Sequence, residues 1–226
     1  MNCSCQNCSV KNIFYESLMG DDLQDFCDAR MEVVIPAGKK FIKQGDEIGT
    51  FKYLKDGLIK LHRTNTSGKE QIISFGKPMD FVSIHNIFSE THYTYSVTAI
   101  QKSTICTFDM CLIMDLLRSN GTFAERIIKT TSIASNRILS NSLNMIGKSM
   151  FGKVASVLLF FHEKVFFTYG FELPISRKEI AQYTGLSIET VIRVISEFRR
   201  DGLLKVFGKR IEIIDKDGLV QIHENS

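Results

Sequence analysis

Three cysteines lie within the first eight residues of the chain: Cys3, Cys5 and Cys8, separated only by Ser, Gln and Asn. This polar stretch cannot build a hydrophobic core, so packing does not account for the cysteines. Thiolates at such short spacing can converge on one metal ion, and cysteine thiolates also hold iron–sulfur clusters. The alternative is a flexible arm that carries reactive thiols. Both interpretations remain open at this point.

A second group of chemically capable residues lies in the last quarter of the chain. Residues spaced i, i+1, i+4 and i+5 share one face of a helix, and here they are Ile188, Glu189, Ile192 and Arg193. In the major groove of DNA, Arg193 would donate two hydrogen bonds to guanine. Glu189 would accept one from the amine of cytosine, and Ile188 would touch a thymine methyl group. The spacing therefore predicts a face that reads bases.

Start and stop signals predict the two helices that position this face. Ser176, followed three residues later by Glu179, is a capping box. Gly185 ends that helix, because glycine adopts the left-handed conformation of a sharp turn without steric cost, and Ser187 caps a second helix. In the second helix the apolar residues recur at helical spacing and face inward: Val191, Val194, Ile195 and Phe198. This pattern is typical of a helix-turn-helix.

A β-hairpin is expected next, because apolar runs at residues 203–207 and 211–214 flank a turn at Gly208. A helix-turn-helix followed by a hairpin is a winged helix, in which Lys209 and Arg210 are placed to touch phosphate. An ordinary helical hairpin with a solvated charged face is the alternative. The agreement of cap, turn glycine and buried spacing favours the winged helix.

The distribution of charge supports this prediction more than the net charge of +3 does. Between Ser176 and Arg210, eight basic residues stand against four acidic ones, whereas the residues before Gly147 include 16 basic and 15 acidic ones. A local positive surplus is what binding to phosphates requires. A solvated charged surface would look similar, so the charge supports the motif without establishing it.

Length and composition exclude several classes of protein. A chain of 226 residues, 44% hydrophobic, suits one or two domains with real cores. No signal peptide is visible, and the longest apolar run, residues 154–161, is too short to cross a bilayer. We therefore expect a cytoplasmic protein without membrane contact, whose six cysteines are thiols or metal ligands. No phosphate loop or HExxH motif is present, so we expect no enzyme.

Short strands and one long helix are predicted for the rest of the chain. Residues 31–108 show apolar runs of strand length between turn sequences such as Gln44-Gly45-Asp46, which favours an antiparallel barrel or roll. Residues 109–119 predict a short helix. Residues 123–146 predict a long helix whose heptad-spaced positions form a seam: Ile127, Thr131, Ala134, Ile138, Asn141 and Met145.

This seam suits a dimer. Small Ala134 would let two helices approach closely, and a buried Asn141 would fix their register. Packing against the roll would produce the same pattern. However, Ile128, Ile133 and Leu139 lie off the seam, so one side can contact the roll and another the same helix of a partner. We favour a two-fold homodimer, because helix-turn-helix proteins commonly bind paired half-sites.

Over essentially its whole length the chain resembles the CRP/FNR family of bacterial transcription regulators, named for the cyclic-AMP receptor protein and the fumarate–nitrate regulator. The resemblance rests on residues 44–46, 56–61, 175–181 and 189–193. It implies an α+β fold with an N-terminal antiparallel β-roll of the cyclic-nucleotide-binding (jelly-roll) type, a long dimerisation helix and a C-terminal winged helix-turn-helix. The expected domains are a sensor with its cysteine arm (1–120), the dimerisation helix (121–147) and the DNA-binding domain (148–226).

The resemblance also implies a function: a homodimer that binds a palindromic promoter site and contacts RNA polymerase. Glu189 and Arg193 match the family's two principal base-reading positions. Ile188 resembles the apolar residue of the FNR branch, whereas Ile192 replaces its serine, which argues against a standard FNR half-site. We expect a palindrome with a central G·C pair in each half, of the TTGA-like or TTGC-like kind. The expected DNA-binding residues are Ser176, Arg177, Ser187, Ile188, Glu189, Thr190, Ile192, Arg193 and Lys209. The alternative is an effector-binding module whose winged helix contacts protein instead of DNA.

The resemblance also bears on the signal that the roll would sense. The receptor's nucleotide-pocket motif falls at residues 81–96, where Ile84 replaces the glutamate and Thr94 the phosphate-binding arginine. Without that cation, cyclic AMP is not expected. The FNR branch instead holds a [4Fe-4S] cluster through three N-terminal cysteines and one in the roll. By this resemblance the candidate ligands are Cys3, Cys5, Cys8 and Cys106, with Cys111 as a spare.

This cluster assignment departs from the FNR pattern at one position. Phe14 stands where the branch has its third cysteine, so Cys3 would have to substitute for it. Haem is an alternative cofactor, and its candidate axial ligands are His62, His85, His92 and Met79. A small organic effector in the roll is a further alternative.

Overall fold

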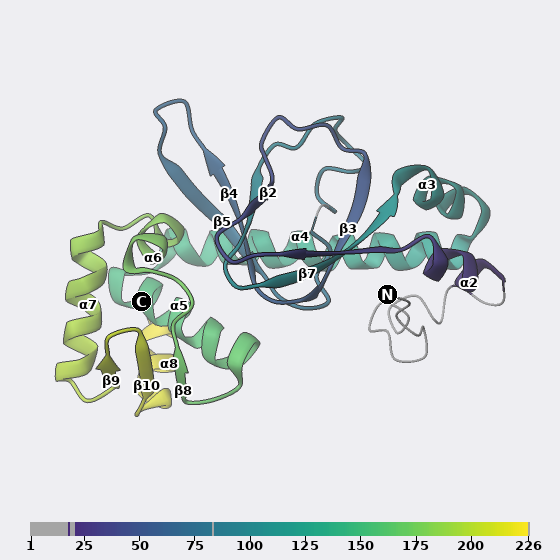
Figure 1. The fold of residues 1–226 in the computed structure, drawn as a ribbon. Helices are drawn as coiled ribbons and strands as arrows, with labels where there is room; N and C mark the ends of the chain where they lie inside the picture. The colour runs from purple at the N-terminus through teal and green to yellow at the C-terminus, as the bar shows by residue number, and fades with distance from the viewer. Residues whose placement is uncertain (1–17, 19–20, 83, 226) are drawn as a thin grey trace. The chain divides into compact units, whose positions relative to one another are not determined.

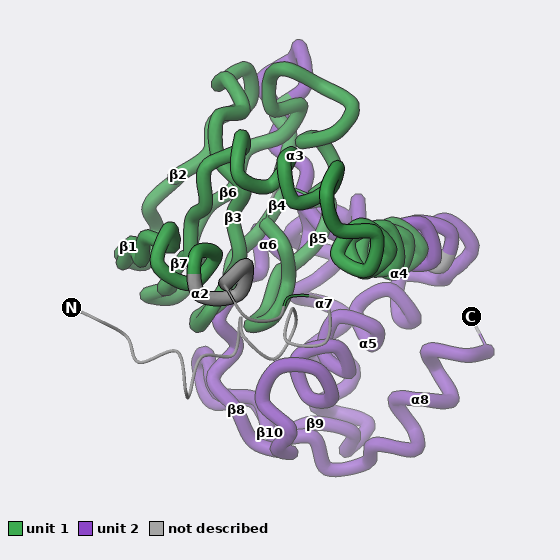
Figure 2. Tube along the Cα trace, turned by 90° about the vertical axis from the view of Figure 1, so that its right-hand side faces the viewer, with its two compact units in different colours: residues 1–64, 73–138 green, residues 65–72, 139–226 purple. Residues whose placement is uncertain are grey.

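A computed structural model describes residues 18, 21–82 and 84–225. The chain divides into two units (Figure 2). One comprises residues up to 64 together with residues 73–138, and the other comprises residues 65–72 and 139–226. Within the described residues, none of the helices combines the length and the apolar character that crossing a membrane requires.

Seven strands form the roll (Figure 1): β1 (Met31–Ile35), β2 (Lys40–Ile42), β3 (Thr50–Asp56), β4 (Ile59–Thr64), β5 (Glu70–Gly76), β6 (Ser96–Ala99) and β7 (Ser103–Asp109). They make two sheets, with strand orders β1-β7-β3 and β2-β6-β4-β5. β7 pairs antiparallel with both β1 and β3, and β6 pairs antiparallel with β2 and β4. The prediction of an antiparallel roll is confirmed.

One turn of the roll requires glycine. Gly57, between β3 and β4, has a φ of +101°, and a Cβ at this position would lie 2.6 Å from the Cα of Ser103. Any side chain would therefore collide with β7 as well as strain the backbone. The Asp56-Gly57 turn is in this way fixed by packing between strands.

Aromatic side chains fill the core between the sheet and the helices of this unit. The rings of Phe26 and Phe108 stack with centroids 4.3 Å apart, and Phe123 meets Phe26 edge-on at 6.2 Å. Phe26 comes from α2 (Asp21–Asp28) and Phe123 from α4 (Gly121–Gly147). Both are almost fully buried, so burial of these large rings fastens two helices to the sheet.

The helices that follow the roll differ in part from the prediction. α3 (Met110–Ser119) has Asp109 as its N-cap, as expected. α4 and α5 (Met150–Phe160) are separated by only two residues, because the Ser149 hydroxyl accepts a hydrogen bond from the Gly152 amide at 3.2 Å and starts α5 early. α5 therefore begins at Met150, where the sequence alone would suggest a hinge at residues 147–152 and a helix start at residue 153. A π-helical turn, η2 (Phe161–Phe166), extends α5.

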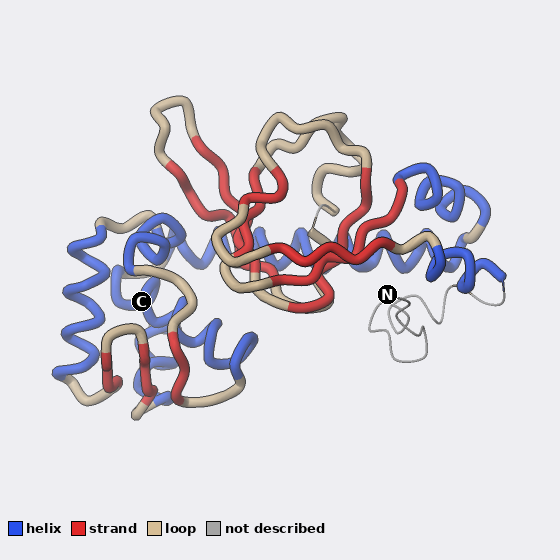
Figure 3. The backbone as a smooth tube through the Cα atoms, viewed as in Figure 1, coloured by secondary structure: helices blue, strands red, loops and turns tan. Residues whose placement is uncertain are grey.

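Besides α5 and η2, the second unit contains the predicted winged helix, β8 (Gly170–Glu172) and α8 (Lys216–Glu224). Its helix-turn-helix consists of α6 (Arg177–Thr184) and α7 (Ile188–Arg200), and its wing of β9 (Leu204–Phe207) and β10 (Arg210–Ile213). β8 completes a sheet of order β8-β10-β9 (Figure 3). The last helix, α8, packs on α5. The prediction omitted β8 and α8.

Candidate DNA-reading face and sensor cavity

Hydrogen bonds within a few residues fix the start of both helices of the helix-turn-helix. The Ser176 hydroxyl accepts from the Glu179 amide at 3.2 Å, while the Glu179 carboxylate accepts from the Ser176 amide at 2.8 Å. Gly185 ends α6 at a φ of +73°. The Ser187 hydroxyl then accepts from the Thr190 amide at 3.1 Å. These caps orient the first turn of α7, where base contacts would be made.

The apolar side of α7 is buried and its other side is open to solvent. The inward-facing set expected from the sequence is fully buried: Val191, Val194, Ile195 and Phe198. On the opposite face Glu189 and Arg193 are exposed, and so are the large apolar side chains of Ile188 and Ile192, the latter at 50%. Two exposed isoleucines between charged residues form a surface suited to contact with a partner.

Arg193 is held by two contacts in the free protein. One terminal nitrogen, Nη1, lies 3.2 Å from the Glu197 carboxylate, one turn further along α7. The other, Nη2, donates to the thioether sulfur of Met150 at 3.0 Å. Hydrogen bonds from its own backbone amide and from the Ser187 side chain lower the pKa of the Glu189 carboxyl, which favours its ionised form. An exposed guanidinium and an exposed carboxylate thus lie one turn apart.

The remaining predicted DNA contacts occupy different environments. Lys209 and Arg210 are exposed at the turn between β9 and β10, where Gly208 has a φ of +62°. Arg177 is half-buried, and burial lowers the pKa of its guanidinium. The hydroxyls of Ser176 and Ser187 already serve as helix caps. DNA contact by these residues stays a prediction.

The long helix α4 presents a different apolar face from the predicted seam. Ile127 is only 2% exposed, because it lies in the core of its own chain with Phe26 and Phe123, and Ala134 packs against the same core. Ile127 is thus occupied within its own chain, and a place for it in the dimer interface stays a prediction. Most of the exposed large apolar side chains of α4 lie about 100° further round the helix: Ile128, Leu139, Leu143 and Ile146. Ile133, also exposed, lies on another side and lines a cavity beside the roll.

A cavity of about 170 Å³ lies between the roll and α4, within the first unit. It contains a cation that the sequence did not predict: Arg137 donates from Nη1 and Nη2 to the two carboxylate oxygens of Asp80, at 3.0 and 3.1 Å. His85 also lines it. Burial, and then Arg137, lower the pKa of this imidazole, while Asp80 opposes the shift. The cavity is smaller than the roughly 300 Å³ of ordinary ligand pockets.

The nucleotide-pocket positions of the family carry other chemistry here. Ile84 is 2% exposed and belongs to the aromatic core, so no polar group stands where the family has a glutamate. The hydroxyl of Thr94 accepts from the Asn86 side-chain amide at 3.0 Å. The sequence of residues 81–96 includes no lysine or arginine, and Arg137 of α4 brings a positive charge to the lining of this cavity.

Of the four predicted cluster ligands, only Cys106 lies in the described part of the chain. Its side chain is fully buried among the aromatic rings of the core. Cys3, Cys5 and Cys8 lie outside the described residues. Among those that are described, no three His, Cys, Asp or Glu side chains gather as metal ligands, so these residues do not by themselves fit a cluster. The four-cysteine site stays a prediction.

The candidate haem ligands and the spare cysteine are scattered over the first unit. His62 is buried, and its Nε2 lies 2.9 Å from the Thr98 hydroxyl. Nδ1 of His92 is within hydrogen-bond distance of the hydroxyl of the neighbouring Thr91, at 2.9 Å. Met79 is exposed with a positive φ of 77°, and Cys111 is exposed. Hydrogen bonding to Asp109 raises the pKa of the Cys111 thiol, which makes it a weak ligand at neutral pH.

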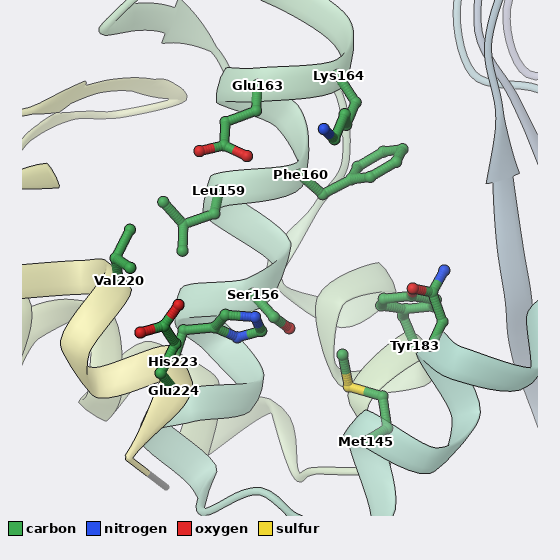
Figure 4. A pocket seen from close by; sticks show the side chains of 11 residues that line it. Met145, Ser156, Leu159, Phe160, Glu163, Lys164, Tyr183, Val220, His223 and Glu224 are labelled. Carbon is green, nitrogen blue, oxygen red and sulfur yellow. The ribbon is translucent and has the colours of Figure 1, made fainter. Parts of the chain in front are cut away.

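The second unit has a larger cavity, of about 310 Å³ (Figure 4). Glu163, one of the residues that line this cavity, forms an ion pair with Lys216, with 2.8 Å between Nζ and Oε1. Hydrogen bonding to Lys216 lowers the pKa of the Glu163 carboxyl. Side chains from the end of α4, from α5, η2, α6 and α8 line it: Asn141, Met145, Ser156, Leu159, Phe160, Glu163, Lys164, Tyr183, Val220, His223 and Glu224. Its volume is within the range of small-molecule sites.

A jelly-roll sensor, a long helix and a winged helix-turn-helix with an open reading face define a ligand- or signal-responsive DNA-binding regulator. Two family models match the chain: the cyclic nucleotide-binding domain over residues 32–120 and the Crp-like helix-turn-helix domain over residues 152–222. The chain belongs to the CRP/FNR family of transcription regulators, which bind DNA, act as dimers and are not enzymes.

Similar proteins are FNR-type regulators, which supports the FNR branch of this family. The anaerobic regulatory protein of Haemophilus influenzae is 26% identical over 96% of this chain and 87% of its own length. The regulatory protein HlyX of Actinobacillus pleuropneumoniae is 28% identical over 95% and 92%. The fumarate and nitrate reduction regulatory protein of Escherichia coli is 26% identical over 96% and 89%.

Solved structures share the fold. FixK2 from Bradyrhizobium japonicum superposes with a TM-score of 0.78 at 19% identity, over 85% of this chain and 96% of its own. A CooA mutant from Carboxydothermus hydrogenoformans gives a TM-score of 0.71 at 16% identity, over 97% of both chains. The expected α+β architecture, with roll, long helix and winged helix, is thereby confirmed.

Proposed function

We propose that this protein is a homodimeric, cytoplasmic transcription regulator that places one α7 helix in each half of a palindromic promoter site. The observation that supports this most directly is the exposed face formed by Ile188, Glu189, Ile192 and Arg193 on a helix whose other side is buried. Such a helix fits the major groove, and two-fold related copies read half-sites one helical turn of DNA apart, about 34 Å.

Each exposed residue of α7 has a proposed role in reading the half-site. Arg193 binds O6 and N7 of a guanine, and Glu189 accepts from the amine of a cytosine. Ile188 and Ile192 contact thymine methyl groups, which fits a TTGA-like or TTGC-like sequence. Lys209 in the wing and the first turns of α6 and α7 contact phosphates, and so hold the helix in register. The first turns contribute Ser176, Arg177, Ser187 and Thr190.

We propose that the dimer forms along α4. The exposed side chains of Ile128, Leu139, Leu143 and Ile146 supply the apolar contact, because large apolar side chains at heptad-like spacing are stabilised by an identical neighbour. The neighbouring seam positions, Thr131, Ala134, Ile138, Asn141 and Met145, are partly buried in one chain. They border the contact, and Asn141 sets its register.

The signal is proposed to act through the first unit. A redox or gas signal, or a small ligand beside Arg137, would favour one of two arrangements of α4 and so change the spacing of the two reading helices. If a [4Fe-4S] cluster is present, Cys3, Cys5, Cys8 and Cys106 would hold it and supply sensitivity to oxygen. RNA polymerase is the proposed protein partner at the promoter.

Binding to DNA duplexes tests the central proposal. Fluorescence anisotropy with a palindrome of two TTGA-like half-sites is compared with a duplex in which both half-sites are scrambled, at several salt concentrations. We expect specific binding by a dimer, with affinity that falls steeply with salt because phosphates release counterions. Equal affinity for both duplexes, or affinity independent of salt, would contradict the proposal.

The cofactor is tested separately. Protein purified without oxygen is examined by absorption spectroscopy, with iron and sulfide assayed together. A broad absorption that bleaches in air, with matching iron and sulfide, is expected for the cluster, and Cys3→Ser, Cys5→Ser, Cys8→Ser and Cys106→Ser should each abolish it. A sharp Soret band would indicate haem. Colourless, iron-free protein that still binds DNA would leave the organic effector.

A further inference from the structure

Met150 touches the residue that is proposed to read guanine. Its thioether sulfur accepts a hydrogen bond from Nη2 of Arg193 at 3.0 Å, although the two residues are 43 positions apart in the chain. The opposite guanidinium nitrogen, Nη1, binds Glu197. Both terminal nitrogens that would form a two-point contact with guanine are therefore engaged inside the free protein.

The packing of the second unit holds Met150 at this place. Met150 is the first residue of α5, and the Ser149 hydroxyl caps that helix. The ring of the next residue, Phe151, lies 6.0 Å from the ring of Phe198 on α7. Because Phe198 is fully buried, this contact fixes the first turn of α5 against α7 and keeps the sulfur near Arg193.

The strength of the acceptor decides whether Arg193 is available to DNA. A thioether sulfur is a weak acceptor, so guanine O6 and N7 can replace it at little cost. The sulfoxide oxygen of oxidised methionine is a strong, polar acceptor, and hydrogen bonds from charged donors are the stronger ones. The same guanidinium nitrogen cannot serve the sulfoxide and the base at once.

We propose that Met150 is an oxidation site that switches off DNA reading, an inference that rests on the proposed role of Arg193. A two-electron oxidant of the peroxide or hypochlorite class supplies the oxygen. With hydrogen peroxide, the sulfur attacks one oxygen, the O–O bond breaks, the sulfur loses two electrons and water leaves. Methionine sulfoxide reductases reverse this change, whereas thiol reductants do not.

Accessibility is consistent with this chemistry. Met150 is partly exposed, so oxidant reaches its sulfur without unfolding of the domain. Met31 and Met79 are more exposed and will be oxidised as well, but both belong to the other unit and are not bonded to Arg193. They provide internal standards for the extent of oxidation in the same sample.

The test compares oxidised and untreated protein in binding to the palindromic duplex. The full-length wild type is treated with graded hydrogen peroxide and then with a thiol reductant, and the Met150 peptide is followed by mass spectrometry. We expect affinity to fall by about tenfold per half-site, the equivalent of one charge-assisted hydrogen bond. The loss should follow Met150 sulfoxide and be restored by a mixture of the two methionine sulfoxide reductases.

Two substitutions separate the effect of Met150 from that of other oxidised residues. Met150→Leu keeps the size of the side chain but removes the acceptor. Its affinity for DNA should be within about twofold of wild type and should not fall after peroxide treatment. Met150→Gln carries a permanent amide oxygen and should bind weakly without any oxidant. If Met150→Leu loses affinity on oxidation as wild type does, or if Met150→Gln binds as wild type does, the switch is overturned.

Failure of the switch is distinguishable from failure of the proposed function. If untreated Arg193→Ala discriminates between operator and scrambled duplex as wild type does, the assigned base contact is wrong, and the switch fails with it. If Arg193→Ala loses discrimination while Met150→Leu remains sensitive to peroxide, the base contact stands and only the switch is overturned. Absence of sulfoxide at Met150 when Met31 is fully oxidised also overturns it.

Discussion

Arg137 and Asp80 form a two-point ion pair across 57 positions of sequence, with nitrogen–oxygen distances of 3.0 and 3.1 Å. Asp80 lies in the segment that follows β5, where it also accepts from the Lys77 amide at 3.0 Å. Arg137 lies on α4. The pair therefore joins the roll to the helix that is proposed to form the dimer, and parallel guanidinium–carboxylate bonds hold both partners in a defined geometry.

Breaking this pair should weaken the attachment of α4 to the roll. Arg137→Ala and Asp80→Ala should each lower the free energy of unfolding, and a double-mutant cycle should give a coupling of about 1–2 kcal/mol, because the pair is bidentate but partly solvated. Chemical denaturation of wild type, both single variants and the double variant provides the measurement. Additive effects of the two substitutions would show that the pair contributes no coupling.

Acid should destabilise the roll through His85. Its pKa in the folded protein lies below the ordinary value of 6.5, chiefly because it is buried and also because Arg137 faces it, with Asp80 in opposition. The unfolded chain then binds the proton first, so stability is complete above about pH 6.5 and falls as the pH drops towards the folded pKa.

His85→Gln removes this titration while keeping a polar side chain. Denaturation midpoints measured between pH 8 and pH 5, at constant ionic strength, should fall less in the variant than in wild type. The two proteins are compared by this pH-dependent difference, so a uniform loss of stability in the variant does not matter. If the midpoints of both proteins fall equally between pH 8 and pH 5, His85 is not the source of the acid sensitivity.

A charge among the exposed apolar side chains of α4, a stripe formed by Ile128, Leu139, Leu143 and Ile146, should disrupt the proposed dimer. Leu139 is 58% and Ile146 81% exposed in one chain, so Leu139→Arg leaves the folded protomer intact but places like charges against each other in the proposed interface. Sedimentation of wild type should give a dimer and of Leu139→Arg a monomer. Lys129→Ala, also on α4 but outside the stripe, is the control. A dimeric Leu139→Arg would place the interface elsewhere.

Loss of a helix cap should cost stability without changing specificity. Ser176→Ala removes the hydroxyl of the capping box and should lower the free energy of unfolding by about 1 kcal/mol. Ser196→Ala is a matched control, since the Ser196 hydroxyl only bonds to the Ile192 carbonyl within α7. Urea denaturation distinguishes the two. Equal midpoints would mean that the capping box adds nothing in this protein.

Local rules predicted the helix-turn-helix closely. The capping serine Ser176, the turn glycine Gly185 and the second cap Ser187 all act within four residues of their partners, so their signals are present in a short stretch of sequence. β8 was missed because its three residues are ordered mainly by pairing with β10, about 40 positions later. Such pairing leaves no periodicity within the strand itself.

Contacts between distant positions decided what sequence patterns left open. The heptad pattern in α4 did not reveal which of two apolar sides meets the roll, and burial of Ile127 in the aromatic core supplied the answer. Arg137 and Asp80, and likewise Arg193 and Met150, give no sign of their pairing in the sequence, because they are 57 and 43 positions apart. Only the fold brings each pair together. Neither the place of Arg137 in the cavity beside the roll nor the contact between Arg193 and Met150 could therefore be predicted.

Removing Arg193, which is proposed to read guanine, should change specificity and leave the fold unchanged. Arg193 is exposed, and its contacts with Glu197 and Met150 lie on the surface, so Arg193→Ala should unfold at the same denaturant concentration as wild type. Its preference for the operator over a duplex with the guanine replaced should fall by about 1–3 kcal/mol per half-site, the value of one two-point base contact.

A second arginine on α7 separates base reading from simple charge. Arg200, at the far end of the helix, is exposed and paired with Asp201 at 3.3 Å. Arg200→Ala removes the same charge, so it should lower affinity for all duplexes to the same small extent and keep the discrimination between them. If both variants lose affinity equally for operator and altered duplex, Arg193 acts on phosphate instead of guanine, and the base contact must be assigned to another residue.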